Sequence, residues 1–420
     1  MNILLIGAGG REHALAYAIA ASPLLDRLYC APGNPGTAEC GTNVALDIGD
    51  HAAVAQFCQA NEIGLVAVGP EAPLVAGIVD DLTTHGIKVF GPSRAAARLE
   101  GSKGFTKDLC ARAGIPTAAY RRFNNAEAAL SHVAESGAPL VVKVDGLAQG
   151  KGVTVAETTA EAAEAVRQAF AGPSGKARPE VVIEERLLGP ELSFFALCDG
   201  RHVLPLGTAE DYKRVGEGDT GPNTGGMGAF SPSRLIDPAL EAAILGQIVR
   251  PTLEALADMG TPYRGVLYAG LMLTAEGPKL IEYNVRFGDP ECQVLMMRLK
   301  DDIVTLMLGA VDGVLETMSA RFRGEPALTV VIAAKGYPGT VEAGGAIHGL
   351  AAAAAVEGVV VFQAGTRRQG EQLLASGGRV LNVTASGPTL ETARQRAYQA
   401  VSLIDLPGSF YRRDIGKRPR

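Results

Sequence analysis

The chain has 420 residues, 47% of them apolar and 20% charged, with a formal net charge of −6 and no tryptophan. This length predicts two or three domains with well-packed cores, and the acidic balance excludes the broad basic surface of a nucleic-acid-binding protein. The six cysteines are scattered, without a Cys-x-x-Cys pair, and no signal peptide or membrane-spanning run is present, so we expect a cytoplasmic protein without a membrane partner.

The first hundred residues alternate between short apolar runs and helical patterns. The apolar runs cover residues 2–6, 27–30, 64–68 and 87–90, and the helical patterns cover residues 11–20, 52–60 and 72–83. This alternation predicts an α/β fold with a doubly wound parallel sheet. Polar and glycine-rich loops follow the strands, at the carboxyl ends where such sheets bind ligands.

A second unit begins near Lys103 with a helix through Ala113. Strands are predicted over 139–143 and 152–156, joined by a glycine-rich loop, and are followed by a helix over 160–171 and a strand over 181–185. A polar, glycine-rich loop is expected from Asp211 to Gly228. The tail adds strands over 328–333 and 379–384 and a helix over 389–404, which indicate a small third α/β domain.

The most informative stretch is an apparent strand that carries Glu282, Asn284 and Arg286. Alternate residues of a strand share one face, so these three side chains are expected to project together. A carboxylate and an amide oxygen suit a hard cation such as Mg²⁺, and a guanidinium beside them suits a phosphoryl group. The pattern favours a nucleoside triphosphate site, although a half-exposed edge strand with mixed polar residues would also fit it.

The loop between the strands at 139–143 and 152–156 has glycines at positions 146, 150 and 152. These glycines would let backbone N–H groups approach a polyphosphate, although the order of a P-loop is absent. Lys143, at the end of the preceding strand, is placed to reach the phosphates as a point charge. Glu184 and Glu191 are candidates for adenine and ribose contacts, and each would otherwise be an ordinary surface acid.

The turn Gly7-x-Gly-Gly-x-x-His13 admits three interpretations. It could seat a dinucleotide, but the next strand ends Tyr29-Cys-Ala-Pro-Gly33 without the carboxylate that the ribose requires. A phosphate-bearing substrate at the helix N-terminus and a purely structural turn are the other two.

Taken together, these motifs resemble the phosphoribosylamine–glycine ligase family of the ATP-grasp superfamily. The resemblance spans essentially the whole chain and rests on the segments Gly9–His13, Pro32–Asn34, Val68–Leu74, Lys143–Gly152, Asp211–Arg214, Gly221–Gly228 and Glu282–Glu291. It implies an N-terminal substrate domain (1–102), an ATP-grasp domain (103–325) with a mobile lid at about 120–187, and a C-terminal domain (326–420).

The resemblance also implies roles for individual residues. An ATP site is implied at Lys103, Lys143, Gly146, Gly150, Lys151, Gly152, Glu184, Glu185 and Glu191. A site for glycine and 5-phosphoribosylamine is implied at Gly9, Gly10, Arg11, Glu12, His13, Pro32, Gly33, Asn34, Pro70, Glu71, Asn223, Thr224, Gly225, Gly226 and Arg286. Mg²⁺ or Mn²⁺ is expected at Glu282 and Asn284, and the catalytic groups are expected to be Arg286, Lys143, Asp211 and Lys213.

The implied reaction joins glycine to 5-phosphoribosylamine through glycyl phosphate, at the expense of ATP, in purine biosynthesis. It needs positioning and charge neutralisation rather than an enzyme nucleophile. Two alternatives are another ATP-grasp carboxylate–amine ligase or carboxylase, and a nucleotide-binding regulator without activity, which would lack an intact metal pair. We expect a monomer or a weak dimer.

Overall fold

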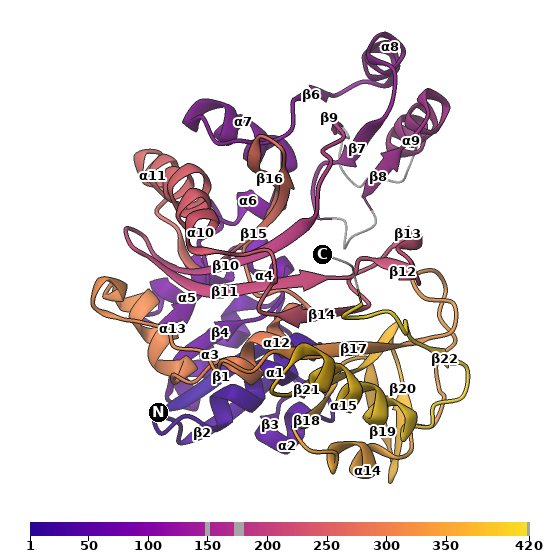
Figure 1. Cartoon of the computed structure of the whole chain (residues 1–420). Helices are drawn as coiled ribbons and strands as arrows, with labels where there is room; N and C mark the ends of the chain where they lie inside the picture. The colour runs from indigo at the N-terminus through magenta and orange to yellow at the C-terminus, as the bar shows by residue number, and fades with distance from the viewer. Residues whose placement is uncertain (148–151, 172–179, 418–420) are drawn as a thin grey trace.

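The computed structural model describes residues 1–147, 152–171 and 180–417. The N-terminal elements and the C-terminal elements form the base of the molecule, and residues 120–185 project from the opposite end as a separate lobe (Figure 1). We refer to this lobe as the lid. In the described parts of the chain, no helix combines the length and the apolar character needed to cross a membrane.

The N-terminal sheet has five parallel strands in the order β3-β2-β1-β4-β5. They are β1 (Asn2–Gly7), β2 (Arg27–Pro32), β3 (Thr42–Asn43), β4 (Ile63–Val68) and β5 (Val89–Phe90). Because side chains alternate along a strand, Ile3 and Leu5 share a core with α1 (Gly10–Ala20), whereas Leu4 and Ile6 share one with α3 (His51–Ala60) and α5 (Ile78–Thr84). The predicted doubly wound parallel sheet is confirmed.

Two predicted elements of this region differ from the structure. The helix expected over 72–83 is divided into α4 (Glu71–Ala76) and α5 by Gly77, whose φ of 93° suits only a residue without a β-carbon. The strand expected over 87–90 is shorter, because only Val89 and Phe90 pair with β4. A short helix, α2 (Thr37–Cys40), was not predicted.

The lid contains an antiparallel sheet in the order β6-β9-β7-β8, with two helices and a core of its own. Its elements are β6 (Tyr120–Phe123), α8 (Ala126–Ser136), β7 (Leu140–Val144), β8 (Val153–Ala156), α9 (Thr159–Ala171) and β9 (Val181–Glu185). Leu140 and Val142 face this core, so the alternate residues Val141 and Lys143 face the body of the protein. The lid therefore has a sheet and a hydrophobic core separate from those of the body.

A nine-stranded antiparallel sheet runs through the body of the protein, and it includes the strands of the predicted third domain. Its path is β16-β15-β10-β11-β14-β17-β21-β18, and β22 pairs with β17. The strands are β10 (Glu191–Asp199), β11 (Val203–Asp211), β14 (Gly228–Ser231), β15 (Arg264–Thr274), β16 (Gly277–Asn284), β17 (Ala327–Ala334), β18 (Val359–Gln363), β21 (Arg379–Ser386) and β22 (Ser409–Phe410). Four strands from the last hundred residues, β17, β18, β21 and β22, thus extend the central sheet.

Helices cover this sheet and connect it to the N-terminal sheet. They are α6 (Arg98–Gly101), α7 (Lys103–Ala113), α10 (Pro238–Ile244), α11 (Arg250–Asp258), α12 (Glu291–Arg298), α13 (Ile303–Asp312), α14 (Leu350–Ala354) and α15 (Leu390–Ser402), with a π-helical turn at Leu245–Val249 and a 3₁₀ turn at Leu315–Thr317. Helix α12 packs against α1 on one side and against β11 and β14 on the other. It joins the two sheets through one apolar core.

The polar loop expected from Asp211 to Gly228 is partly regular. It contains a two-stranded hairpin of β12 (Arg214–Gly216) and β13 (Thr220–Asn223), which pair only with each other among the described strands. A second isolated hairpin, β19 (Thr366–Gln369) with β20 (Gln372–Ala375), lies in the C-terminal part. Few apolar residues occur between Asp211 and Gly228, so hydrophobic periodicity could not reveal the first hairpin.

Candidate active site

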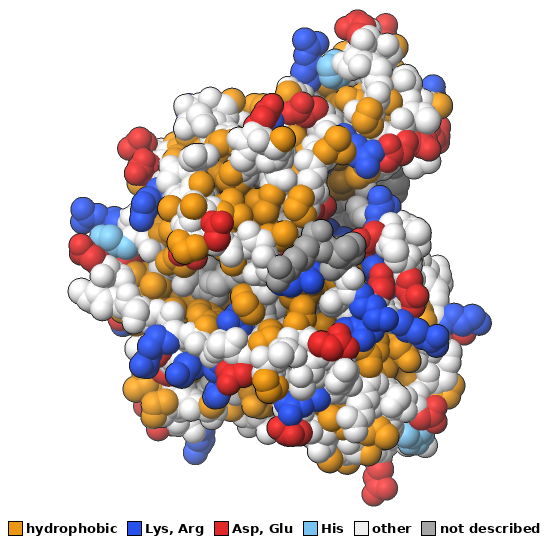
Figure 2. Space-filling model, in the orientation of Figure 1, with side chains coloured by type: hydrophobic (Ala, Val, Ile, Leu, Met, Phe, Trp, Pro, Cys, Tyr) orange, Lys and Arg blue, Asp and Glu red, His pale blue; other side chains and the backbone are white. Residues whose placement is uncertain are grey.

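A cavity of about 480 Å³ lies where the lid, the N-terminal sheet and the large sheet meet. In the space-filling view the lid is a distinct lobe with a hollow beneath it (Figure 2). Residues from all parts of the chain line the cavity, including Arg11, Glu71, Lys103, Glu282 and Arg379. The cavity is strongly charged, and most of its ionic side chains are at least partly buried.

Strand β16 supplies the expected metal pair. Glu282 and Asn284 both line the cavity. Tyr283 between them also borders it, but this side chain is buried and its hydroxyl lies 2.6 Å from that of Thr252. The backbones of both residues pair with β15, but neither side chain forms a hydrogen bond or ion pair with any residue that the structure describes. Their oxygen atoms are therefore available to a ligand. No cluster of three or more His, Cys, Asp or Glu suited to a metal occurs in the described ranges.

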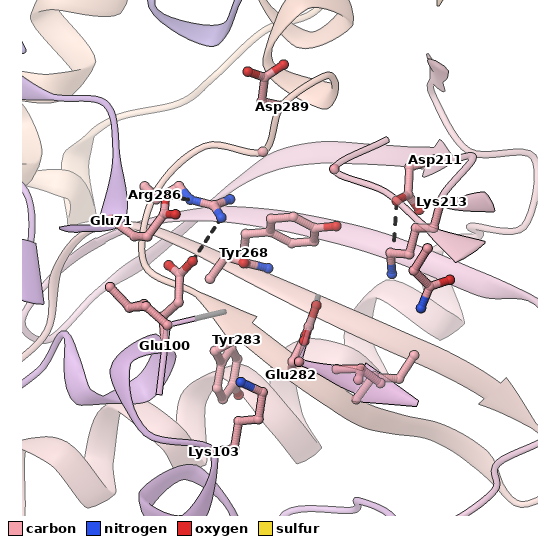
Figure 3. A pocket seen from close by; sticks show the side chains of 18 of the residues that line it. Glu71, Glu100, Lys103, Asp211, Lys213, Tyr268, Glu282, Tyr283, Arg286 and Asp289 are labelled. Carbon is pink, nitrogen blue, oxygen red and sulfur yellow. Dashed lines mark hydrogen bonds and ion pairs between the residues drawn. The ribbon is translucent and has the colours of Figure 1, made fainter. Parts of the chain in front are cut away.

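Arg286 lies in the loop after β16, because the strand ends at Asn284 rather than continuing as predicted. Its guanidinium donates to Glu71 Oε2 at 3.1 Å and to Glu100 Oε1 at 2.8 Å (Figure 3). Burial disfavours the charged guanidinium, but Glu100 and Glu71 outweigh that effect and raise the pKa of Arg286 above its ordinary value. The guanidinium is thus held in place and kept charged.

Three lysines border the cavity below the lid. Lys143 and Lys107 flank one carboxylate: Lys143 Nζ lies 3.0 Å from Glu184 Oε1, and Lys107 Nζ lies 3.1 Å from Glu184 Oε2. Lys103 donates to the carbonyl oxygen of Gly146 at 2.9 Å. Burial lowers the pKa of Lys107 and of Lys103, although nearby carboxylates oppose the shift. Two lysines sharing one carboxylate leave an excess positive charge beside the cavity.

Lys107 was not among the residues predicted for the site. It lies four residues after Lys103, and residues at this spacing share one face of a helix such as α7. The pattern Lys103-x-x-x-Lys107 was therefore a signal that could have found it. Glu100, Tyr268, Asp289, Glu291, Tyr337 and Arg379 also line the cavity and were not predicted.

A second cavity of about 390 Å³ adjoins the first, between the lid and β15–β16. Apolar side chains line it on both sides: Val141, Val153, Val155, Leu188, Met272 and Ile281. Glu184 Oε1 borders it and is buried without a hydrogen-bond partner, because Lys143 Nζ, although near, is not aligned for a hydrogen bond. A flat apolar slot with one unsatisfied acceptor is suited to a base that carries an amino group.

Glu185 and Glu191 occupy different positions on this cavity. Glu185 is exposed, and its Oε1 accepts from the backbone N–H of Ala119 at 2.9 Å. Glu191, at the start of β10, accepts from Lys213 Nζ at 2.7 Å. Burial opposes the charge of Lys213, but Asp211 and Glu191 more than offset it and raise its pKa well above the ordinary value.

The glycine-rich segment after β13 forms the wall opposite the lid. Asn223, Thr224 and Gly225 line the large cavity, and the backbone N–H of Thr224 donates to Lys213 O at 2.7 Å. From the C-terminal part, Arg379 donates to Gly225 O at 2.6 Å and the hydroxyl of Tyr337 accepts from the backbone N–H of Gly225 at 3.0 Å. Residues more than a hundred positions apart thus shape one wall.

Of the predicted residues in the N-terminal sheet, Arg11 and Glu71 reach the cavity. Glu12 instead caps its own turn, accepting from Gly9 N at 2.6 Å and pairing with Arg11 at 2.5 Å. The others are not among the residues that line the cavity: Gly9, Gly10, His13, Pro32, Gly33, Asn34 and Pro70.

Several of these residues make structural contacts with the C-terminal part. His13 Nδ1 accepts from the backbone N–H of Gln363 at 2.8 Å, and Asn34 Nδ2 donates to Gln363 O at 2.9 Å. A β-carbon on Gly10 would come within 2.2 Å of Asn382 Nδ2, so a larger residue there would require the side chain of Asn382 to shift. Burial lowers the pKa of His13 to about 4, so this side chain is neutral near pH 7.

The remaining predicted ATP-site residues lie on the loop between β7 and β8. Gly146 and Gly152 line the large cavity. Gly150 and Lys151 fall outside the described residues. Gly226 follows the cavity wall, and its backbone N–H donates to Thr224 Oγ1 at 3.0 Å.

Comparison with known proteins gives one consistent result. The N domain, ATP-grasp (A) domain and C domain of phosphoribosylglycinamide synthetase match residues 1–100, 101–292 and 327–418. A phosphoribosylamine–glycine ligase of Mesorhizobium japonicum is 61% identical, with 99% of this chain and 98% of the relative covered, and that of Brucella melitensis is 57% identical, with 100% and 98% covered.

Solved structures agree with this result. The crystal structure of the phosphoribosylamine–glycine ligase of Thermotoga maritima superposes with a TM-score of 0.86 at 34% identity, covering 99% of this chain and 100% of that chain. A biotin carboxylase of Campylobacter jejuni has a TM-score of 0.73 at 17% identity, covering 98% of this chain and 92% of that chain, which shows a shared fold.

Proposed function

The chain belongs to the phosphoribosylglycinamide synthetase family, and we propose that its large cavity joins glycine to 5-phosphoribosylamine at the expense of ATP. The products are glycinamide ribonucleotide, ADP and phosphate, in a step of purine biosynthesis. The observation that carries the assignment of the site is the pair Glu282 and Asn284, whose side chains lack partners among the described residues, beside a guanidinium held by two carboxylates.

The nucleotide binds between the lid and β15–β16. The apolar side chains of the smaller cavity hold the adenine ring, and the unsatisfied Glu184 Oε1 accepts from its amino group. Glu191 lies at the same cavity and is the candidate for the ribose hydroxyls. Lys103 and Lys143 neutralise the phosphates, and Lys107 remains paired with Glu184.

A divalent cation, Mg²⁺ or Mn²⁺, fits the donor set of this cavity. The carboxylate of Glu282 and the amide oxygen of Asn284 are hard ligands, and protein groups in the described ranges do not occupy them. When bound there, the ion supplies charge neutralisation at the transferred phosphoryl group. A site with two protein ligands, completed by nucleotide and water oxygens, is usual for Mg²⁺.

The chemistry proceeds in two transfers. A carboxylate oxygen of glycine attacks the γ-phosphorus of ATP, ADP leaves, and glycyl phosphate forms. The amine of phosphoribosylamine then attacks the glycyl carbonyl carbon, phosphate leaves with the C–O bond electrons, and the amine loses a proton. Arg286 stabilises the charge that develops on the transferred phosphoryl group, because its guanidinium is fixed before the reaction begins.

Glycine and the ribose phosphate occupy the part of the cavity away from the lid. Asp211 supplies a carboxylate for the glycine ammonium group, and Lys213 and Asn223 lie beside it. Arg11 and Glu71 border the same space from the N-terminal sheet. The lid closes over the nucleotide and excludes water, which would hydrolyse glycyl phosphate.

The division into functional units follows from these contacts. Residues 1–102 bind phosphoribosylamine, residues 103–325 bind ATP and glycine, with a lid at about 120–187, and residues 326–420 complete the wall of the cavity. We propose a monomer or a weak dimer as the active form.

Measuring ADP and phosphate release tests this function directly. The purified chain receives ATP and Mg²⁺ with glycine alone, with phosphoribosylamine generated in place, and with both. We expect release only with both substrates, and one glycinamide ribonucleotide per ADP. Failure with both, while ATP still binds, would leave the fold assignment intact and reject the substrates.

Glu282→Gln and Asn284→Asp test the metal pair. We expect Glu282→Gln to lower turnover on the order of 100-fold while ATP binding is retained, because charge at the transferred phosphoryl group is no longer neutralised. Asn284→Asp keeps an oxygen ligand and should shift the Mg²⁺ dependence instead. Glu276→Gln, an exposed acid just before the same strand, is the matched control and should behave as the wild type.

A further inference from the structure

The hairpin β12–β13 lies at the edge of the cavity but has little support of its own. Its strands pair only with each other in the described structure, and residues 217–222 are exposed. Its two ends nevertheless carry cavity residues, with Lys213 just before β12 and Asn223 at the end of β13. Something other than sheet pairing must fix the position of these ends.

The C-terminal segment, residues 409–417, forms hydrogen bonds with this hairpin. Arg412, which is 1% exposed, donates through Nη1 to Asp219 Oδ1 at 2.8 Å and to the carbonyl oxygen of Arg214 at 2.9 Å. Its guanidinium also forms a bidentate pair with Asp414, at 2.8 and 2.6 Å. A buried arginine therefore connects β12 and the turn of the hairpin to residues 409–417.

Two further contacts enclose the tip of the hairpin. Asp414 Oδ2 accepts from the backbone N–H of Gly218 at 2.9 Å, and Glu217 Oε1 accepts from the backbone N–H of Arg413 at 3.0 Å. The Arg412 guanidinium also lies 4.9 Å from the ring centroid of Tyr212, the residue before Lys213. Backbone and side-chain groups of both the hairpin and the C-terminal segment therefore take part in these contacts.

The segment is itself anchored to the body of the protein. Tyr398 on α15 donates its hydroxyl to Arg412 O at 2.6 Å, and Arg394 on the same helix donates to Ile415 O at 3.1 Å. Ile415 is fully buried. Residues 409–417 therefore connect the hairpin to α15.

We propose that Arg412 is a positioning residue for the ligase reaction: it fixes the hairpin β12–β13 so that Lys213 and Asn223 keep their places at the glycine end of the cavity. Arg412 does not line the cavity, so it acts through the hairpin and not on the substrates. The proposal rests on the function proposed above. It assigns the C-terminal segment a role in the reaction, where the fold alone would require only that the chain end be packed.

The main test replaces the guanidinium and measures both the hairpin and the reaction. In Arg412→Met, we expect faster amide hydrogen exchange in a peptide covering residues 212–226, and kcat/KM for glycine lowered on the order of 10-fold, since small displacements of positioning groups slow such reactions strongly. Arg412→Lys keeps the charge but not the planar fork, and should recover only part of the loss.

The matched control is Arg396→Met. Arg396 lies on α15, the helix that anchors the C-terminal segment. It donates a hydrogen bond to Ser386 O at 2.9 Å and pairs with Glu357 at 2.6 Å, away from the hairpin. We expect it to leave both exchange in 212–226 and kcat/KM for glycine as in the wild type. If both variants lose kcat/KM for glycine to the same extent, the effect reflects the overall stability of the protein, and the proposal is overturned.

Asp219→Asn provides a second route if Arg412→Met does not fold. Asp219 has a φ of 56°, and asparagine tolerates this conformation, so the substitution removes only the charge that Arg412 meets. Exchange should accelerate in 212–226 and kcat/KM for glycine should fall. Unchanged exchange, or faster exchange with unchanged kcat/KM, overturns the proposal. Because exchange needs no substrate, it separates this result from a failure of the proposed function, which would show as an inactive wild type.

Discussion

The buried ionic side chains of the cavity are paired with one another. Glu184 is shared by Lys107 and Lys143, and Arg286 is shared by Glu71 and Glu100. Such groups are costly to bury unless they are paired, and removing one partner leaves the other uncompensated. Lys107 and Lys143 share one carboxylate beside the cavity, and a polyphosphate bound as proposed above would complete this local charge balance.

Because His13 is buried, we expect the free energy of unfolding to depend on pH. Burial lowers its pKa to about 4, whereas the unfolded chain titrates near the ordinary value of 6.5. Between these two values the unfolded chain binds a proton that the folded chain does not, so the free energy of unfolding falls as the pH drops through this window. At pH 5 the loss is about 2 kcal/mol.

His13→Asn should remove this dependence, because asparagine offers an acceptor to Gln363 but does not titrate. The measurement is urea unfolding of both proteins at pH 7.5 and pH 5, comparing how much each loses. The other histidines contribute equally to both chains. If the two proteins lose the same stability on acidification, His13 is not neutral in the fold.

At the scale of elements, the connection between lid and body borders the smaller cavity, where the proposed function places ATP. Gly189, between β9 and β10, lines this cavity and has a φ of 150°. A β-carbon there would lie 2.0 Å from the carbonyl oxygen of Leu273 on β15. Backbone cannot yield as a side chain can, so this glycine allows the lid to approach the sheet.

Gly189→Ala is therefore expected to raise KM for ATP at least about 10-fold, by displacing the connection, and to lower the melting temperature. Gly260→Ala is the matched control, since Gly260 also has a positive φ, 73°, but a β-carbon would meet nothing within 4 Å. It should cost about 1 kcal/mol of stability and leave KM unchanged. Equal KM values in the two variants would reject the close approach.

At the scale of the whole molecule, one sheet unites the ATP-binding and C-terminal parts. Strand β14 pairs with β11 on one side and with β17 on the other, and Phe230 on β14 is fully buried. The C-terminal part also closes on the N-terminal sheet through Gln363. The matched domains are consequently not independent in folding.

Two deletions should show that the C-terminal part is required for folding, whereas the lid is not. A chain of residues 1–325 lacks β17, β21 and β18, exposes the edge of β14, and is expected to aggregate unless residues 326–420 are co-expressed. A chain in which a short Gly-Ser linker replaces residues 120–185 loses a lobe with its own core, and is expected to be folded but inactive. Size-exclusion chromatography and circular dichroism check both; a folded, monomeric 1–325 would contradict the prediction.

Several features of the fold and site were predictable because they depend on short stretches of chain. Strand period placed Glu282 and Asn284 on one face, and the structure has them in one cavity. The parallel N-terminal sheet followed from alternating apolar runs. Arg286 was expected on the strand but lies beyond it, since strand ends are set by pairing with β15.

Other features depend on contacts between distant segments. Tyr337 and Arg379 reach Gly225 from the C-terminal part, and Arg412 reaches the hairpin from the chain end. The periodicity of apolar and polar residues along a short stretch of sequence cannot predict contacts between distant segments. The same limit applies to His13 and Asn34, whose partner Gln363 is more than three hundred residues away along the chain.

The sequence by itself therefore determined the family, the chemistry and the residues that share a strand or a loop, because side-chain type and spacing are properties of the chain. Only the tertiary structure decided which charges are paired, that the nine-stranded sheet joins two of the family's domains, and that the chain end holds a cavity hairpin. These depend on packing between surfaces, and the free energy of packing is determined by shape and burial across the whole molecule.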